Sequence, residues 1–114
     1  MNLAEIIASL ELKILTPAAD FAALAPDSGY ASDLLSCVMA AAKPNGVWIT
    51  LQAHLNIVAV AALLEQCAVI ITEDAQPDQA TLDKAAEQGV VLLSSPQSTF
   101  QVAGRLWELG LRQG

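Results

Sequence analysis

Three short blocks of the chain are apolar without interruption: VWITL at 47–51, CAVII at 67–71 and VVLL at 90–93. A central strand of a parallel sheet is covered on both faces, so it lacks the alternation of apolar and polar residues that half-exposed strands show. The blocks therefore predict three neighbouring parallel strands. Helical segments between them would supply right-handed crossovers. The pattern thus predicts an α/β fold in three layers, with a mostly parallel sheet of about four or five strands flanked by helices.

Helical periodicity marks the segments between and after these blocks. Helices are expected at 55–66 and at 77–88, the second with a proline in its first turn and a glycine at its end. A last helix is expected to begin at Ser95 and to stop at Gly110. One face of this last helix carries Phe100, Ala103 and Trp107.

The first half of the chain is less regular. Residues 2–10 combine apolar positions at helical spacing with a capping-box pattern, and 12–14 reads as a short strand stopped by a proline. A further helix is expected over 33–42, with Ser32 as its cap. The stretch 18–31 stays open: FAALA is compatible with a strand, and PDSGY with a turn.

Two of the expected helices are apolar on every side. Nine of the ten residues at 55–64 are apolar, and 34–42 is similar. A sheet covers one side of a helix, so the other side needs either a neighbouring helix or a second copy of the chain. We therefore expect a homodimer with an isologous contact, with coverage by a neighbouring helix as the alternative.

Length, composition and charge limit the classes of function. A chain of 114 residues that is 54% hydrophobic fits a single domain over 1–114. The net charge is −7 and the five cations are scattered, so no basic surface is expected for nucleic acid. The longest apolar run, 57–64, is far shorter than the roughly 20 residues that span a bilayer, and the N-terminus lacks a secretory pattern. We expect a cytoplasmic protein without a membrane or nucleic-acid partner.

Residues for catalysis, metal binding and cofactor binding are sparse. His54 is the only histidine, and no Gly-x-Ser-x-Gly elbow accompanies it. Cys37 and Cys67 lie thirty residues apart in apolar surroundings, where they are expected to be small buried side chains and neither a disulfide nor metal ligands. The six glycines are isolated, so no phosphate-binding loop is present. We expect no enzymatic activity, no metal and no cofactor.

Polar residues follow each of the three apolar blocks. The carboxyl ends of parallel strands meet at one edge of the sheet, where α/β proteins bind ligands. The same residue types also cap helix starts, where they satisfy free backbone N–H groups, so capping and ligand binding both stay open. Ser98 and Thr99 follow a turn later. The candidate ligand-binding residues are Gln52, His54, Thr72, Glu73, Ser94 and Ser95.

The charges at this edge of the sheet limit which kinds of ligand could bind there. The carboxylates of Glu73, Asp74 and Asp78 would repel a phosphate group, despite the favourable helix N-termini. A small-molecule ligand stays open as a partner, and a nucleotide is weakened as a candidate but not excluded. His54 taken alone is expected to cap or begin the helix at 55–66.

The chain resembles the DRTGG domain, most strongly from Asp33 to Leu106. The resemblance rests on three segments that occur in order: ITLQAHLNIVAVAALL, AVIITED and PDQATLDKAAEQGVVLLSSPQSTFQVAGRL. The resemblance implies a non-catalytic α/β module. Such modules precede the kinase domain in HPr kinase/phosphorylase-like proteins, occur in some phosphotransacetylases, and lie between CBS domains of certain pyrophosphatases, at a dimer interface. The chain departs from the family motif: its Asp-Arg slot is near Ala53-His54 and its Gly-Gly slot near Glu73-Asp74. An anion-binding role of the motif therefore does not transfer.

Two functions follow from the residues and the resemblance together. The first is a regulatory domain that senses a small ligand at the strand-end edge. The alternative is a protein-interaction or assembly subunit associated with a redox system. Short family members resembling this chain tend to accompany iron-only hydrogenase genes and are often labelled serine kinases, although the phosphate loop of such a kinase is missing here.

Overall fold

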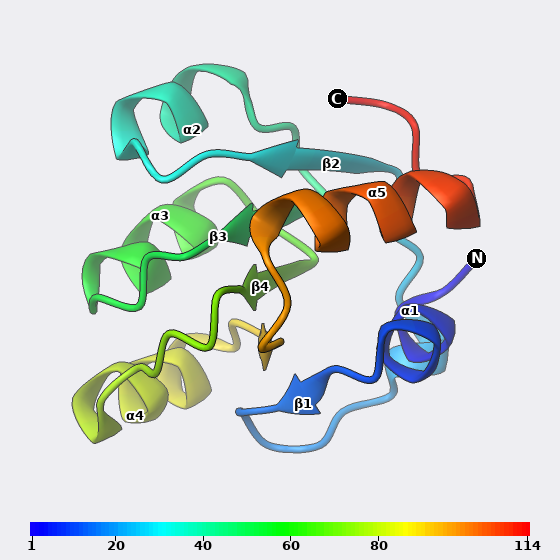
Figure 1. The fold of residues 1–114 in the computed structure, drawn as a ribbon. Helices are drawn as coiled ribbons and strands as arrows, with labels where there is room; N and C mark the ends of the chain where they lie inside the picture. Colours follow the sequence, from blue (N-terminus) through cyan, green and yellow to red (C-terminus); the bar gives the residue numbers. More distant parts are fainter.

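A five-stranded sheet lies between two layers of helices in the computed structural model, which describes residues 1–114 (Figure 1). The strand order is β1-β5-β4-β3-β2, and every neighbouring pair is parallel except β1 with β5. The predicted three-layer α/β architecture with a mostly parallel sheet is confirmed. The strands are β1 (Lys13–Ile14), β2 (Ser28–Ala31), β3 (Gly46–Thr50), β4 (Ala68–Ile71) and β5 (Leu92–Ser94).

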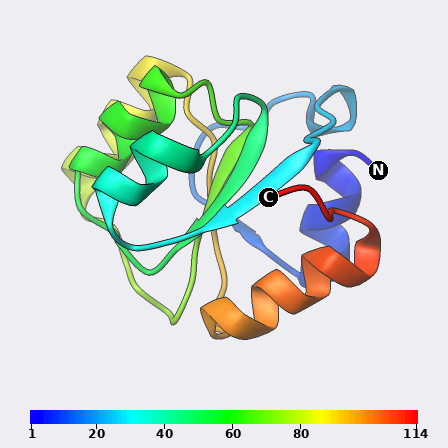
Figure 2. The same ribbon diagram turned by 90° about the horizontal axis from the view of Figure 1, so that it is seen from above.

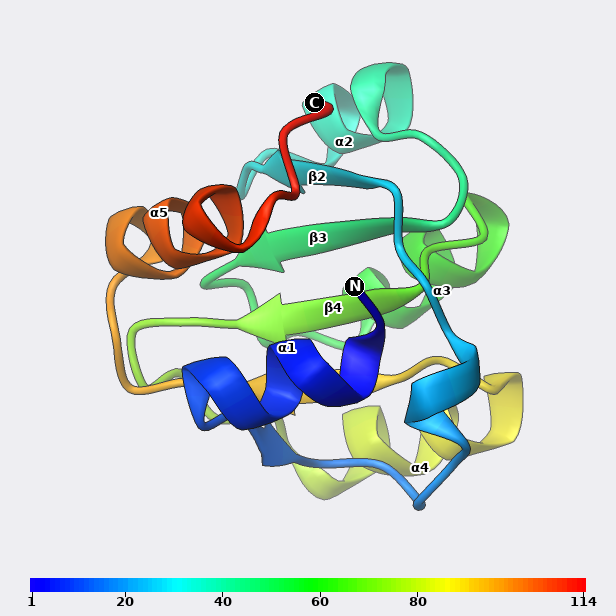
Figure 3. The same ribbon diagram turned by 90° about the vertical axis from the view of Figure 1, so that its right-hand side faces the viewer.

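Helices cover both faces of the sheet (Figure 2). One face is covered by α1 and α5, and Figure 3 looks at this face. The other face is covered by α2, α3 and α4. None of the helices has the length and apolar character needed to cross a membrane. The helices are α1 (Leu3–Leu10), α2 (Leu35–Ala41), α3 (Asn56–Leu63), α4 (Gln79–Gln88) and α5 (Thr99–Leu109), with a 3-10 turn at Phe21–Ala23.

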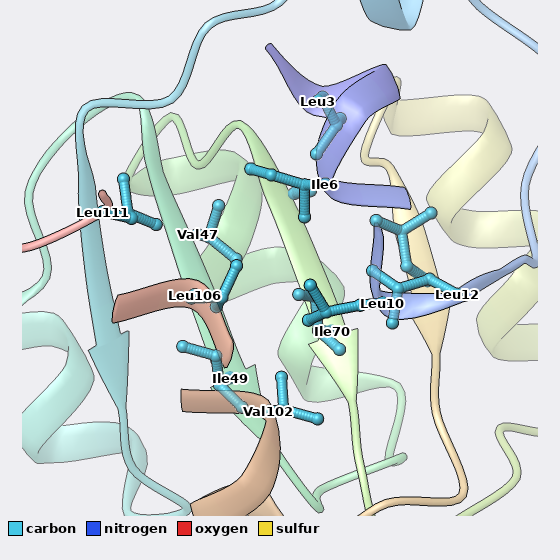
Figure 4. Packing of buried hydrophobic residues seen from close by; sticks show 12 residues of the cluster. Leu3, Ile6, Leu10, Leu12, Val47, Ile49, Ile70, Val102, Leu106 and Leu111 are labelled. Carbon is cyan, nitrogen blue, oxygen red and sulfur yellow. The ribbon is translucent and has the colours of Figure 1, made fainter. Parts of the chain in front are cut away.

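The central strands β3 and β4 are buried at every residue. Successive side chains point to opposite faces, so Val47 and Ile49 enter the core under α1 and α5, which Figure 4 shows from close by. Trp48 enters the second core, under α2, α3 and α4. Both faces of these strands are dry, which explains why their sequences show no alternation.

The N-terminal half contains one strand within 18–31, the stretch that the sequence left open. The turn considered for PDSGY is wrong, because Ser28–Ala31 forms β2. This edge strand pairs in parallel with β3. FAALA is no strand either, and Phe21–Ala23 forms the 3-10 turn. A close approach of the chain at Gly46 accompanies the β2–β3 pairing: a Cβ there would lie 2.7 Å from the Ser28 hydroxyl. Pairing with β3 overrides the local turn preference of proline, aspartate and glycine.

Three helices begin later than predicted. The last helix starts at Thr99 and not at Ser95, because Ser98 forms a capping box with a glutamine three residues on. Likewise α4 starts after Asp78, which accepts the N–H of Thr81, so the preceding proline lies outside the helix. The predicted cap of α2 is also wrong: Ser32 accepts the N–H of Leu34 in the preceding loop, and α2 has no side-chain cap.

The strongly apolar helix is partly covered by its neighbours. Within α3, Ile57, Val58 and Val60 are buried in the second core. Leu63 nevertheless remains 67% exposed, and Leu34 before α2 remains 60% exposed. Neighbouring helices therefore account for part of the apolar excess, and the homodimer stays a prediction.

The two cysteines are free and differ in environment. The prediction that both are buried is wrong for Cys37, which is exposed, because α2 is short and only Val38 in it is fully buried. Cys67 is partly buried just before β4. Burial, and secondarily the nearby Asp27 carboxylate, raise the pKa of the Cys67 thiol.

Candidate ligand-binding edge of the sheet

The carboxyl ends of β3, β4 and β5 lie side by side. In the strand register Thr50 is opposite Ile71, and Ile71 is opposite Ser94. The prediction that these three exits share one edge of the sheet is therefore confirmed. We name the turns that follow the three strands the strand-exit rim, which comprises residues 51–56, 72–78 and 95–99.

The turn after β4 is bound to the first residue of α5. Thr72 is fully buried, and its hydroxyl lies 2.6 Å from the hydroxyl of Thr99. The backbone N–H of Thr99 donates to the Glu73 carboxylate at 2.9 Å. An anionic group at the start of a helix is also favoured by the helix dipole. Thr72 and Glu73 therefore fix where α5 begins.

The turn after β4 is also hydrogen-bonded to the turn after β5. The N–H of Glu73 donates to the carbonyl of Gln97 at 2.8 Å, and the N–H of Asp74 donates to the carbonyl of Ser95 at 3.2 Å. The hydroxyl of Ser95 accepts the N–H of Gln97 at 3.1 Å. These backbone donors are all occupied, so the turn offers no free nest of N–H groups to an anion.

Glu73 and Asp74 are held in a strained conformation. Their φ angles are 60° and 58°, in the left-handed region that side chains disfavour. Each such residue costs roughly 1–3 kcal/mol and persists only where its surroundings over-determine it. The three hydrogen bonds from these two residues to the turn after β5 and to α5 supply that restraint.

One acceptor at the rim has no partner. The side-chain oxygen Oε1 of Gln97 is buried without a hydrogen bond. Buried polar atoms are usually paired with protein or water, so this oxygen is free to accept a donor from outside the chain. The Oε1 of Gln66, before β4, is unpaired in the same way. Gln97 was missed from the sequence because nothing in its spacing separates it from a surface glutamine.

Gln52 belongs to a second cluster, which joins the exit of β3 to the exit of β2. Its side-chain amide donates to the carbonyl of Asp33 at 3.3 Å. The Asp33 carboxylate in turn accepts the Thr50 hydroxyl and the Leu51 N–H, both at 2.8 Å. Sequence reasoning missed Asp33 because it missed β2. An aspartate two residues after the end of a strand is the signal that would have found it.

His54 lies at the start of α3, as predicted. Its Nδ1 accepts the N–H of Asn56 at 3.2 Å, and the side chain is exposed. It also faces the start of α4. The pKa of Asp78 is lowered chiefly by the hydroxyl and N–H of Thr81, and the charge of His54 contributes in the same direction. His54 thus holds the first N–H of α3 from the preceding turn, although the N-cap position itself is Leu55 and has no side-chain cap.

The six predicted residues therefore divide into three groups. Thr72, Glu73 and Ser95 join one hydrogen-bonded network across the exits of β4 and β5. Gln52 and His54 lie at the exit of β3 and bind other partners. Ser94 is still within β5, opposite Lys13 of β1, and belongs to the strand and not to the rim turns. No cluster of three or more His, Cys, Asp or Glu side chains is placed to hold a metal ion.

Fold and rim together define a class of protein: a small α/β domain whose parallel sheet is covered on both faces and presents polar turns at its carboxyl edge. The DRTGG domain model matches residues 33–109, and the chain belongs to this family. No curated protein matches the chain.

Among solved structures, the chain is similar to the CBS and DRTGG domains of the regulatory region of Clostridium perfringens pyrophosphatase, complexed with the activator diadenosine tetraphosphate. The TM-score is 0.74 at 13% sequence identity, so the similarity is one of fold. The match covers 91% of this chain and 45% of that chain, so this chain corresponds to less than half of the regulatory region.

The strained turn agrees with the family resemblance. The resemblance places the two glycines of the family motif near Glu73 and Asp74. Glycine adopts positive φ without a steric cost, and both residues here have positive φ. Both residues therefore have a backbone conformation that glycine adopts most readily, with acidic side chains in place.

Proposed function

We propose that this chain is a non-catalytic regulatory domain that senses a small ligand at the strand-exit rim. The observation that carries the proposal is the strained pair Glu73 and Asp74, held against the turn after β5. Strain in non-glycine residues concentrates at ligand clamps and switches, where a change of state can release it. The regulatory role of the pyrophosphatase region with the same fold, and the activator named with it, support this class of function.

The chemistry of the rim favours a ligand that donates hydrogen bonds. Gln97 offers an unpaired acceptor, and Glu73 and Asp74 add negative charge. An amine, amide or hydroxyl group satisfies these acceptors, whereas a phosphate meets repulsion and occupied N–H groups. A nucleotide would fit this rim through the amino group of its base, with its phosphates directed away.

The role proposed is regulatory because the reactive groups are committed to structure. His54 uses Nδ1 to hold the start of α3, and the hydroxyls of Thr72 and Ser95 bond to neighbours and not to an imidazole base. The two cores share one sheet, which supports a single domain over 1–114. We place this domain in the cytoplasm.

A thermal-shift screen of small metabolites tests the proposal. The panel includes diadenosine tetraphosphate, adenosine, and amines and amides without phosphate. We expect at least one compound to raise the melting temperature in proportion to the logarithm of its concentration above Kd. The shift should shrink in His54→Ala, in Gln52→Ala and in Gln97→Ala.

Gln88→Ala is the matched control, because Gln88 is an exposed glutamine at the opposite end of the sheet, at the end of α4. A ligand that binds at the rim keeps its full shift in this variant. Shifts that fall equally in Gln97→Ala and Gln88→Ala, or a panel without any shift, contradict the proposal.

The second candidate is an assembly subunit. Leu34 and Leu63 leave apolar surface exposed on the side of α2 and α3, which is the chemistry of a protein contact. A homodimer or a redox enzyme of the hydrogenase type are the partners this candidate names. Co-purification with such an enzyme from the native host, lost in Leu63→Ser, supports this candidate, whereas recovery of the domain alone counts against it.

A further inference from the structure

An apolar pocket of about 140 Å³ lies between β2, α5 and the C-terminal tail that follows α5. The tail runs back beside β2 (Figure 3), where the N–H of Gly29 donates to the carbonyl of Gln113 at 2.8 Å. None of the residues that line the pocket belongs to the strand-exit rim. The apolar wall of the pocket consists of Ile49, Ala103, Leu106, Trp107 and Leu111.

Small residues at two positions leave this space open. Gly29 has no side chain where it lines the pocket, and a Cβ there would lie 3.5 Å from Cδ2 of Leu111 and 3.9 Å from Cδ1 of Ile49. On the opposite side, Ala103 is the smallest residue of α5 at the pocket. A dry cavity of about 150 Å³ holds one benzene ring. The pocket therefore has the volume and the lining for a single aromatic ring, which would also contact the ring of Trp107.

One positive charge is fixed at the margin of the pocket. The guanidinium of Arg112 lies over the Trp107 ring, 5.8 Å from its centroid, and its Nε donates to the Trp107 carbonyl at 3.1 Å. The two terminal nitrogens of this guanidinium donate to no group of the chain and form no ion pair. A guanidinium held in this way presents parallel N–H donors, whose geometry matches a carboxylate.

The charges around the pocket favour an anion, although the chain as a whole is acidic. The side chains of residues 99–114 carry a net charge of +1, from two arginines and Glu108, whereas the other side chains carry −8. Glu108 lines a separate polar hollow on α5, together with Gln101 and Gly104, and does not line the apolar pocket. An anionic ligand is therefore attracted to this pocket, whereas the carboxylates of the rim repel it.

We propose that this pocket binds a small aromatic monocarboxylate, with its ring against Trp107 and its carboxylate on the guanidinium of Arg112. The volume and lining of the pocket select the ring, and the free end of the guanidinium selects the carboxylate. This binding site is additional to the strand-exit rim and does not depend on it. The rim favours ligands that donate hydrogen bonds, whereas an ionised carboxylate only accepts them.

Titration of the ¹⁵N-labelled full chain with sodium benzoate and with phenylacetate tests the site. The two indole N–H signals report on opposite faces of the sheet, because Trp107 lines the pocket and Trp48 lies in the second core, where its Nε1 donates to the Ser32 carbonyl. We expect saturable shifts of the Trp107 indole and of the Leu111 and Gln113 amides at millimolar ligand, with the Trp48 indole unmoved.

Two further compounds separate the ring from the charge. Benzyl alcohol has the ring without the negative charge, and it should bind about tenfold more weakly than benzoate, since a charge-assisted hydrogen bond to Arg112 is lost. Acetate has the charge without the ring, and it should not saturate the site at millimolar concentration.

Substitutions make the same separation within the chain. Arg112→Gln should weaken benzoate about tenfold and leave benzyl alcohol unchanged. Ala103→Leu should abolish the binding of both, because it fills the pocket from a helix position that leucine suits. Arg105→Gln is the matched control, since Arg105 is on the same helix, donates to the Ser9 carbonyl and does not line the pocket. This variant should bind benzoate as the wild type does.

A Trp107 signal that stays unmoved at every benzoate concentration overturns the proposal. So does equal weakening in Arg112→Gln and Arg105→Gln, or binding that survives Ala103→Leu. Benzyl alcohol that binds as tightly as benzoate would assign the pocket to neutral apolar groups, such as a side chain of a partner protein, and would also overturn it. Benzoate and phenylacetate donate no hydrogen bond, so a blank result here leaves the rim proposal standing, and a blank metabolite screen leaves the pocket standing.

Discussion

At the residue scale, local environment gives chemically identical groups different properties. Cys37 is exposed on α2, whereas Cys67 is partly buried and has a raised pKa because of that burial and the Asp27 carboxylate. Thiol reactions proceed through the thiolate, so burial and the raised pKa both slow reaction at Cys67, whereas Cys37 is accessible.

Alkylation by iodoacetamide at about pH 8, near the usual thiol pKa, should modify Cys37 first and Cys67 much more slowly. Mass spectrometry of timed samples measures both rates. In Cys37→Ser only the slow phase should remain. Equal rates at the two sites in the folded wild type would show that the burial of Cys67 is wrong.

The carboxylate of Asp78 makes the stability of the fold depend on pH. Its folded pKa lies below its usual value of 3.8, chiefly because Thr81 donates two hydrogen bonds to it. A lowered folded pKa means that the ionised group stabilises the fold at pH above 3.8, and that this stabilisation is lost as pH falls through the folded pKa.

Asp78→Ala should therefore lower the melting temperature at neutral pH, and the difference from wild type should narrow as the pH falls below 3.8. Thermal unfolding at a series of pH values measures it. Asp83→Ala, at an exposed position within α4, is the control and should show a smaller, flatter difference. A difference that grows toward low pH contradicts the assigned direction.

At the scale of elements, the same substitution at two glycines should have opposite effects. A Cβ at Gly46 would lie 2.7 Å from the Ser28 hydroxyl and 3.0 Å from the Lys43 carbonyl, whereas a Cβ at Gly104 is in open space within a helix. The first is a close approach at the start of β3. The second is a helix position at which glycine is a poor choice.

Gly46→Ala should lower the free energy of unfolding by about 1–3 kcal/mol, the usual range for overpacking. Gly104→Ala should raise it by about 1 kcal/mol, the difference in helix propensity. Urea unfolding at low protein concentration, where the monomer dominates, measures both. The same sign at the two sites would contradict the packing described.

The elements that could be predicted are those whose pattern is set by burial on two faces. The strands β3, β4 and β5 could be recognised from the sequence because both faces of each strand are buried. β2 was not, because it is an edge strand of the residues SGYA, whose strand character comes from pairing with β3. The late start of α5 also follows from tertiary contacts, since Thr72 and Glu73 bind Thr99. No periodicity encodes such contacts.

At the scale of the whole molecule, the strand-exit rim is joined to the start of α5. Thr99, bound by Thr72 and Glu73, is followed directly by Phe100. The edge at which the polar turns meet was predictable from parallel strands alone. The partners within it were not: Asp33 and Gln97 come from a missed strand and from a residue without a distinctive spacing.

The central claim is that the strand-exit rim binds a small ligand. Titration of the uniformly ¹⁵N-labelled chain with a compound from the thermal-shift screen tests it most directly, because ¹H–¹⁵N correlation spectra report on each backbone amide. The account predicts saturable shifts concentrated at residues 51–56, 72–78 and 95–99. Shifts confined to α2, to the C-terminal tail or to the far ends of the strands would contradict it.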